Sequence, residues 1–393
     1  MADMKNSNSQ RWVYYLLFIV ILLMAGYFRF VGLNWDQSQH LHPDERFMTM
    51  VESALEPVNT FSAYFNTAES TLNPHNRGYS FYVYGDLPVT IVRYTAAWLS
   101  DLSLSAQKYV QSHGADGLLG PLMQKLGATT NWAGYDEVVL LGRVLSAIAD
   151  IGSIILLYLI ALRLYGRKVA TLSAAFSALA VMQIQQSHFF TVDMFANFFM
   201  VLTTYFAVEV MSGGDGDVEI VRQSFSANDR VKEILNAYLH NPLVWNVIGF
   251  GVALGASVAS KINAAPMAGL LPLALLIRFF RQRANTVKEQ EGAGDAAEDR
   301  SVPVYVKPVI SLETIGVLLV LGGLFSALAF RVFMPYAFSG PGFFGVVPNP
   351  KWVQNISEQR AQASGDVDFP PALQWARRSI FYSGYHLAAY GMG

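Results

Sequence analysis

The chain has 393 residues, of which 53% are hydrophobic and only 14% are charged, and its formal net charge is −2. Soluble globular domains contain about 25% charged residues, so this composition is typical of a chain that lies largely in a membrane. The near-neutral charge gives no field that would attract nucleic acid, and the lack of cysteine excludes disulfides, thiolate metal sites and cysteine nucleophiles.

Stretches of about 20 mostly apolar residues are long enough to cross a bilayer. The first such stretch, 12–30, is longer than the apolar core of a signal peptide, and no small-x-small cleavage site follows it. It is therefore predicted to be a retained membrane helix. The predicted spans are 12–30, 138–162, 169–187, 191–211, 243–262, 264–281 and 310–332. They predict an all-α fold, a multi-pass helical bundle in the membrane.

The basic residues beside these spans predict the orientation of the bundle. They form three groups: Lys5 and Arg11; Arg163, Arg167 and Lys168; and Arg278, Arg281, Arg283 and Lys288. With seven spans all three groups lie on one side, which the positive-inside rule assigns to the cytoplasm. We therefore expect a cell-membrane protein with a cytoplasmic N-terminus.

The same topology divides the chain into regions. Residues 1–332 are expected to form the transmembrane domain, which includes a large outer loop at 31–137. A second outer segment, 333–393, ends without a polar tail, so we expect it to lead into a missing C-terminal part of a longer chain. Any chemistry is expected at the outer face, because the inner side shows no sign of a soluble catalytic domain.

The densest polar cluster follows the first span, in the sequence QHLHPDERF at 39–47. Pro43 is typical of the first position of a helix, so Asp44 and Glu45 would lie in the first turn, where acids stabilise the helix dipole. This structural interpretation competes with a catalytic one, in which one carboxylate is a general base. Neighbours on a helix diverge by about 100°, so both cannot face the same atom. Asp44 is the preferred base and Glu45 a supporting residue. We expect the loop to fold as interfacial helices that begin near Pro43.

Two further groups of residues are candidates for the same site. His40, His42 and Asp44 lie within five residues and are candidate ligands of a divalent metal ion, although their spacing is not a standard zinc signature. The sequence leaves the need for a metal open. Asp193, at the start of the fourth span, is either a helix-terminal acid or a second acid of the site, and we expect it to share one outer cavity with Asp44.

Three charged residues lie within or at the ends of predicted spans: Arg143, Asp150 and Lys261. Such residues are costly at membrane depth and usually face a partner or a cavity. Arg143 and Asp150 are seven residues apart and share a helix face, so an ion pair between them is the structural interpretation. Lys261 is a candidate for holding a lipid phosphate, with snorkelling to the interface as the alternative.

The order of these features resembles the GT-C superfamily of glycosyltransferases. Within it, the chain is most similar to the family-39 protein O-mannosyltransferases and the related lipid A aminoarabinose transferases. In the loop after the first helix, the acidic pair Asp44-Glu45 precedes GDLP at 85–88, which resembles the family's D-x-P-P-L stretch with Val89 in place of the second proline. Arg143 at the second span, the basic turn 163–167 and the stretch 188–193 follow in the same order.

The resemblance implies an inverting glycosyltransferase that uses a polyprenyl-phosphate-linked sugar at the outer membrane face. The acceptor would be a hydroxyl of a protein, lipid or glycan. A polyprenyl phosphate is already a good leaving group, so the two carboxylates of ordinary glycoside hydrolysis are not required. One base, Asp44, suffices, and Arg143, Lys261 or a metal ion would stabilise the phosphate charge.

Two other classes of function compete with this hypothesis. One is a membrane transporter or flippase for lipid-linked or anionic solutes, whose path Arg143, Asp150 and Lys261 would line. Transporters usually contain internal repeats, and the sequence shows none. The other is a non-catalytic membrane scaffold, which would leave the clustered outer acids without a role.

Overall fold

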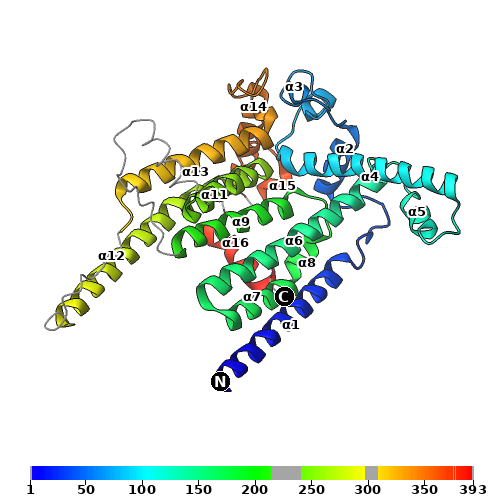
Figure 1. Ribbon diagram of the computed structural model, residues 1–393. Coiled ribbons are helices and arrows are strands. Elements are labelled where there is room, and N and C mark those ends of the chain that lie inside the picture. Colours follow the sequence, from blue (N-terminus) through cyan, green and yellow to red (C-terminus); the bar gives the residue numbers. More distant parts are fainter. Residues whose placement is uncertain (1, 214–239, 297–308, 375, 377, 392–393) are drawn as a thin grey trace, which may run out of the picture.

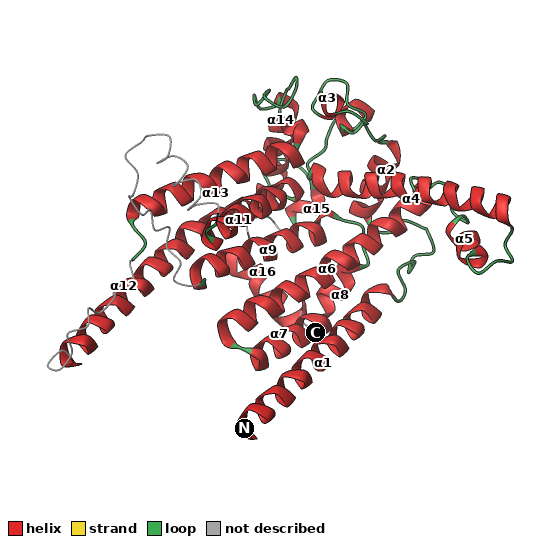
Figure 2. Ribbon diagram, in the orientation of Figure 1, coloured by secondary structure: helices red, strands yellow, loops and turns green. Residues whose placement is uncertain are grey.

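The computed structural model describes residues 2–213, 240–296, 309–374, 376 and 378–391 (Figure 1). The described residues form helices and connecting loops, with no strand beyond an isolated bridge between Phe338 and Pro348 (Figure 2). The predicted all-α fold is confirmed.

Six helical segments are long and apolar enough to cross a membrane, judged within the described part of the chain. One of them joins the 3-10 helix η2 (Ile262–Gly269) to α12. The helices that carry the six segments are α1 (Ala2–Phe30), α6 (Tyr135–Tyr165), α9 (Val192–Ser212), α11 (Pro242–Ser260), α12 (Leu270–Ala296) and α13 (Leu312–Phe333). These helices confirm a multi-pass membrane fold.

The predicted span 169–187 is not one continuous helix. It is divided into α7 (Arg167–Leu179) and α8 (Val181–Ser187) by Ala180, whose backbone is extended at φ −64° and ψ 115°. The end of α7 leaves carbonyl groups without partners inside the helix. The Arg29 guanidinium donates to two carbonyl groups at this end, Ala178 O at 3.0 Å and Ser177 O at 3.2 Å, and Ser177 O also accepts from the N–H of Ala180 at 3.4 Å.

The divided segment still returns the chain along the bundle. Arg143 near the start of α6 donates to Glu45, and the backbone N–H of Phe190, just after α8, donates to the same carboxylate. Residues 143 and 190 therefore lie at the same end. The pair α7–α8 therefore runs antiparallel to α6 and returns the chain to the end from which α6 began.

Close helix contacts hold the bundle together. Helix α11 packs against α9 and α13, α6 packs against α9 and α7, and α1 packs against α7 and α6. Two glycines of α11 allow α13 to approach: a Cβ at Gly251 would lie 2.5 Å from Gly322 O, and one at Gly255 would lie 2.6 Å from Ser326 O. Small residues at helix interfaces are typical of membrane bundles.

The first large loop and the start of the second gather at the end of the bundle drawn at the top of Figure 1, whereas the C-terminal part of the second loop is drawn lower, level with the membrane helices. The first carries α2 (Pro43–Ala54), α3 (Phe61–Tyr64), η1 (Pro74–Arg77), α4 (Asp86–His113) and α5 (Gly120–Leu126). The second carries η3 (Pro335–Ala337), α14 (Pro350–Ser364), α15 (Pro370–Leu373), α16 (Ile380–His386) and the π-helical turn η4 (Leu387–Gly391). Hydrogen bonds join the loops, including Ser70 Oγ to Tyr336 Oη at 2.7 Å and Thr67 Oγ1 to Phe338 O at 2.7 Å. We call this region the loop end.

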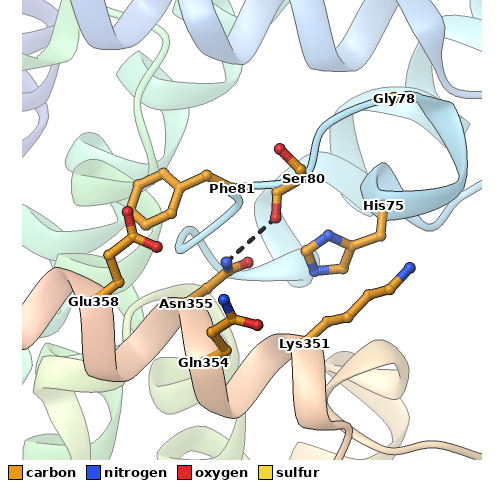
Figure 3. Close-up of a pocket in the computed structure, with 8 residues that line it drawn as sticks. All are labelled: His75, Gly78, Ser80, Phe81, Lys351, Gln354, Asn355 and Glu358. Atoms are coloured by element: carbon orange, nitrogen blue, oxygen red, sulfur yellow. Dashed lines mark hydrogen bonds between the residues drawn. The ribbon is translucent and has the colours of Figure 1, made fainter.

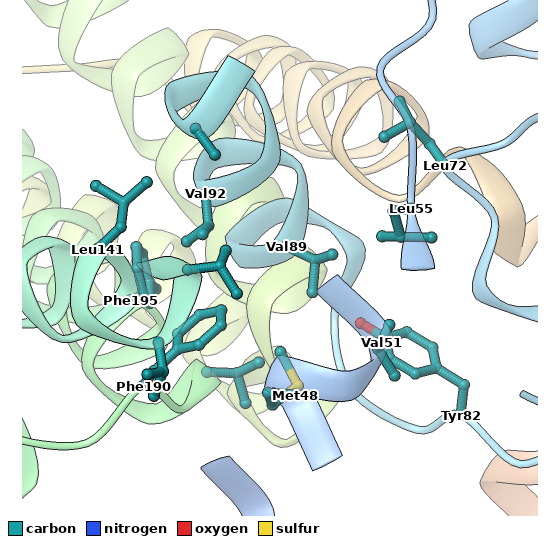
Figure 4. Close-up of a cluster of buried hydrophobic side chains, with 14 of the residues drawn as sticks. Met48, Val51, Leu55, Leu72, Tyr82, Val89, Val92, Leu141, Phe190 and Phe195 are labelled. Atoms are coloured by element: carbon teal, nitrogen blue, oxygen red, sulfur yellow. The ribbon is translucent and has the colours of Figure 1, made fainter. Parts of the chain in front are cut away.

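The helix start predicted at Pro43 is confirmed. His42 is the N-cap of α2, its Nδ1 accepts from the N–H of Glu45, and Pro43 opens the helix. A core of buried apolar side chains then fixes α2 against α4, α6 and the start of α9 (Figure 4). It includes Met48, Val51, Val89, Val92, Leu141, Phe190 and Phe195. This packing holds the first turn of α2, and therefore Asp44, in a fixed position.

Candidate functional site

The neighbours Asp44 and Glu45 have opposite environments. Glu45 is fully buried and accepts hydrogen bonds from Arg143 Nε and Nη2, both at 2.7 Å, and from the N–H of Phe190 at 2.7 Å. Asp44 is exposed at the loop end. A turn of about 100° between neighbours accounts for this division.

Arg143 belongs to a buried ion-pair network. Beyond Glu45, its guanidinium donates to both carboxylate oxygens of Asp36, at 3.0 and 2.9 Å, and to Leu33 O at 2.7 Å. Burial raises the pKa of Asp36, but the hydrogen bonds and charge of Arg143 outweigh it and lower that pKa overall. These bonds occupy the five N–H groups of the guanidinium. Arg143, expected at the donor phosphate, therefore has no N–H left for one, and Glu45 is its partner rather than a free acid.

The expected ion pair between Arg143 and Asp150 does not form. Asp150 Oδ2 instead accepts from Arg29 Nε at 2.5 Å, and both side chains are buried. Seven helical residues separate two side chains by about 10 Å, so a partner on a facing helix is closer.

Two pairs of polar residues from separate elements lie near each other, Asp44 with Tyr84 and Asp193 with Lys261. The Tyr84 hydroxyl donates to Asp44 Oδ1 at 3.2 Å. Burial raises the pKa of Tyr84, and the charges of Asp44 and Asp193 raise it further, so both acids lie within electrostatic reach of one phenol. Asp193, in the first turn of α9, forms an ion pair with Lys261. We call Asp44, Tyr84, Asp193 and Lys261 the Asp44 cluster.

Lys261 reaches this cluster because α11 ends beside the segment that carries Tyr84. Lys261 is the C-cap of α11, and the N–H of Gly85 donates to Ser260 O at 3.2 Å. A Cβ at Gly85 would lie 2.0 Å from Ala259 O and 2.4 Å from Ser260 O, so only glycine permits this approach. The Lys261 and Asp193 side chains remain 42% and 44% exposed, so both are open to a ligand.

The candidate metal ligands are not brought together. His40 Nε2 contacts Asp136 Oδ1 at 3.0 Å and its ring packs on Tyr135, whereas His42 caps α2 and stacks on Phe189. Among the residues that the structure describes, no three His, Cys, Asp or Glu side chains are grouped so that they could hold a metal ion. The trio His40, His42 and Asp44 is therefore not a preformed site.

Three residues near this site were not predicted from the sequence. Asp36 completes the Arg143 network, Tyr84 donates to Asp44, and Asp86 is buried directly after Gly85. Burial raises the pKa of Asp86 to about 7, although the N–H of Tyr336 lowers it in part. The GDLP stretch had drawn attention to this position, but nothing local predicted that the carboxyl group is buried.

One comparison with known proteins gives a match. The family model described as dolichyl-phosphate-mannose-protein mannosyltransferase matches residues 126–217. The matched region includes α6, α7, α8 and α9, and with them Arg143 and Asp193. The match confirms the resemblance to the GT-C superfamily and supports a membrane glycosyltransferase. No curated protein and no solved structure matches the chain.

Proposed function

We propose that this membrane glycosyltransferase transfers a sugar from a polyprenyl-phosphate donor to an acceptor hydroxyl at the loop end, with inversion. The observation that carries the proposal is the Asp44 cluster. It combines an exposed carboxylate with a lysine that is accessible to a ligand, and it lies where the membrane helices end. A lipid-linked donor requires a site at that level.

The chemistry follows from these side chains. Asp44 takes the proton of the acceptor hydroxyl. The hydroxyl oxygen of the acceptor attacks the anomeric carbon of the donor sugar on the face opposite the bond to phosphate. The bond between the anomeric carbon and the phosphate oxygen then breaks, and the polyprenyl phosphate leaves with the bonding electrons. Lys261 stabilises the charge that develops on the phosphate, as preorganised cations do in other transfer reactions. Tyr84 orients Asp44, and Asp193 positions Lys261.

The transporter hypothesis receives no support from the three charged residues on which it depended. Arg143 bonds to Asp36 and Glu45, Asp150 pairs with Arg29, and Lys261 pairs with Asp193. They belong to three separate contacts and do not form one path.

The decisive experiment compares Asp44→Asn with wild type, using membranes and radiolabelled polyprenyl-phosphate sugars. The amide keeps the size of the carboxylate but cannot accept the proton, so we expect transfer to fall about 10²–10⁴-fold. Donor binding should stay nearly unchanged. Asp101→Asn, at an exposed acid of α4, is the matched control and should behave as wild type. Near-normal turnover in Asp44→Asn would exclude Asp44 as the base, and Asp193 would be the next candidate because Glu45 is buried.

Lys261→Ala should differ from Asp44→Asn because the donor phosphate is charged before the reaction begins. We expect it to weaken donor binding and to slow transfer as well. Lys125→Ala, at an exposed lysine of α5, is the control for loss of one positive charge. Unchanged donor affinity in Lys261→Ala would contradict the phosphate-binding role.

A further inference from the structure

A second polar site lies at the loop end, between η1 and α14 (Figure 3). It is a cavity of about 500 Å³. Its lining residues are His75, Gly78, Ser80, Phe81, Lys351, Gln354, Asn355 and Glu358. The volume falls in the range of small-molecule sites, about 300–1,000 Å³.

Asn355 connects the two walls of this cavity. Its buried amide accepts from the N–H of Tyr82 at 3.1 Å and donates to Ser80 O at 3.2 Å. The segment 80–82 is therefore held against α14 without a ligand. A wall that is already formed loses little freedom when a ligand binds.

Three side chains of α14 offer unused hydrogen-bonding groups to the cavity. Lys351, Gln354 and Glu358 are spaced by three and four residues, so they share one helix face. All three are exposed, and within the described residues their side chains form no hydrogen bond or ion pair. Helix packing does not require them, which leaves them available to a ligand.

The donors and acceptors of the cavity are mixed and balanced in charge. Lys351 donates, Glu358 accepts and Gln354 does both. His75 Nδ1 lies 2.9 Å from Tyr79 O, which accepts its proton, so the neutral ring offers Nε2 as an acceptor. Burial lowers the pKa of His75 and the charge of Lys351 lowers it further, which favours this neutral form. Phe81 adds an apolar surface.

This combination suits a neutral saccharide better than an ion. Sugar hydroxyls donate and accept, and the C–H faces of the ring pack on an aromatic side chain. An anionic ligand would meet the carboxylate of Glu358, and a cationic ligand would meet Lys351. We propose that this cavity binds a neutral saccharide, as the glycan part of the acceptor.

The cavity lies close to Asp44, the proposed base. Its role in holding the acceptor rests on the proposed function. Phe81 lines the cavity, and Tyr84, three residues later, donates to Asp44. Three residues span at most about 11 Å. The rings of Tyr82 and Tyr84 are 6.0 Å apart along the same segment. A glycan held in the cavity is thus close to the Asp44 cluster.

Saturation-transfer NMR on the purified full chain in detergent tests the cavity directly. The probes are methyl α-mannopyranoside, methyl α-glucopyranoside and neutral disaccharides, with glucuronic acid and a serine-containing peptide as competing ligand classes. We expect a neutral saccharide to bind. The single variants Gln354→Ala and Glu358→Ala should each weaken its binding about tenfold or more, since each removes hydrogen bonds to the ligand and those to the charged Glu358 are strong. Arg360→Ala, half a turn away on α14, is the control and should bind as wild type.

The outcomes separate this inference from the proposed reaction. Asp44→Asn should bind the saccharide normally while it fails to transfer sugar. If no polyprenyl-phosphate sugar is used but the saccharide binds and the α14 variants weaken it, the cavity is a saccharide site and the proposed reaction is wrong. If transfer occurs but no saccharide binds, if the α14 variants bind as wild type, or if the acid or the peptide binds instead, the saccharide site is wrong.

Discussion

At the scale of single residues, the environment of each acid decides what it can do. Asp44 is exposed beside a tyrosine hydroxyl, Glu45 is held by a buried arginine, and Asp86 is buried with Oδ2 left without a hydrogen-bond partner. A buried carboxyl with a raised pKa is neutral over part of the physiological range. Asp86 therefore gives the loop end a pH dependence.

Asp86→Asn should change how stability depends on pH. Burial raises the folded-state pKa of Asp86 from 3.8 to about 7, so between these values the folded protein keeps a proton that the unfolded chain releases. Stability due to this group is present at low pH, falls as pH rises through this range, and stays lower above it, by about 4 kcal/mol in all. The asparagine variant should lose less thermal stability than wild type between pH 5 and pH 8. Parallel melting temperatures across that range would contradict the raised pKa.

At the scale of elements, buried ion pairs set the relative positions of helices. Arg143 joins α6 to the loop after α1 and to α2, and Arg29 joins α1 to α6 and to the end of α7. Breaking a buried pair leaves an uncompensated charge, whereas replacing all partners with neutral groups costs much less. The two arginines are therefore expected to act through folding and not through a ligand.

Arg143→Met tests this structural role. It leaves Asp36 and Glu45 buried without their partner, which is expected to cost about 3–5 kcal/mol and to lower the melting temperature sharply. Adding Asp36→Asn and Glu45→Gln should restore much of that loss. Protein that remains folded should bind the donor with unchanged affinity. If Arg143→Met melts as wild type but binds the donor weakly, then Arg143 holds the phosphate, as the sequence had indicated.

Local signals explain what the sequence predicted well. The start of α2 at Pro43 depends on His42, Pro43 and the acids beside them, which are contiguous. The shared cavity of Asp44 and Asp193 was expected from topology, because both acids follow the outer ends of helices, and it stays a prediction. In contrast, Arg29 meets Asp150 across 121 positions and also stabilises the end of α7. No local pattern around Ala180 predicts the break between α7 and α8, because the guanidinium that donates to the last carbonyl groups of α7 comes from another helix.

At the scale of the whole molecule, the arrangement of the proposed site requires that both loops lie on one side of the membrane. The divided pair α7–α8 decides this arrangement. If it crosses the membrane once between residues 165 and 190, α9 begins at the loop end. The N–H of Phe190 donates to Glu45, which places the end of that return beside α2, and Arg29 donates to Ala178 O, which places its middle beside the end of α1. The side of the membrane on which each loop lies can be tested by labelling exposed positions from outside the cell.

Single-cysteine labelling provides that test, because the chain contains no cysteine of its own and the unmodified protein is a silent control. Two variants, Ser112→Cys and Gln185→Cys, place a cysteine at exposed positions at or near the loop end. A third, Tyr165→Cys, places it at the far end of α6, where the native side chain is 69% exposed. A membrane-impermeant maleimide added to intact cells should label the first two and leave Tyr165→Cys unlabelled until the membrane is opened, because the basic turn after α6 favours the cytoplasm. If Gln185→Cys is instead labelled together with Tyr165→Cys, α7–α8 does not cross, and Asp193 cannot join Asp44 on the outer face. If Ser112→Cys and Tyr165→Cys exchange sides, the bundle is inverted and a site for an outward-facing lipid donor is excluded.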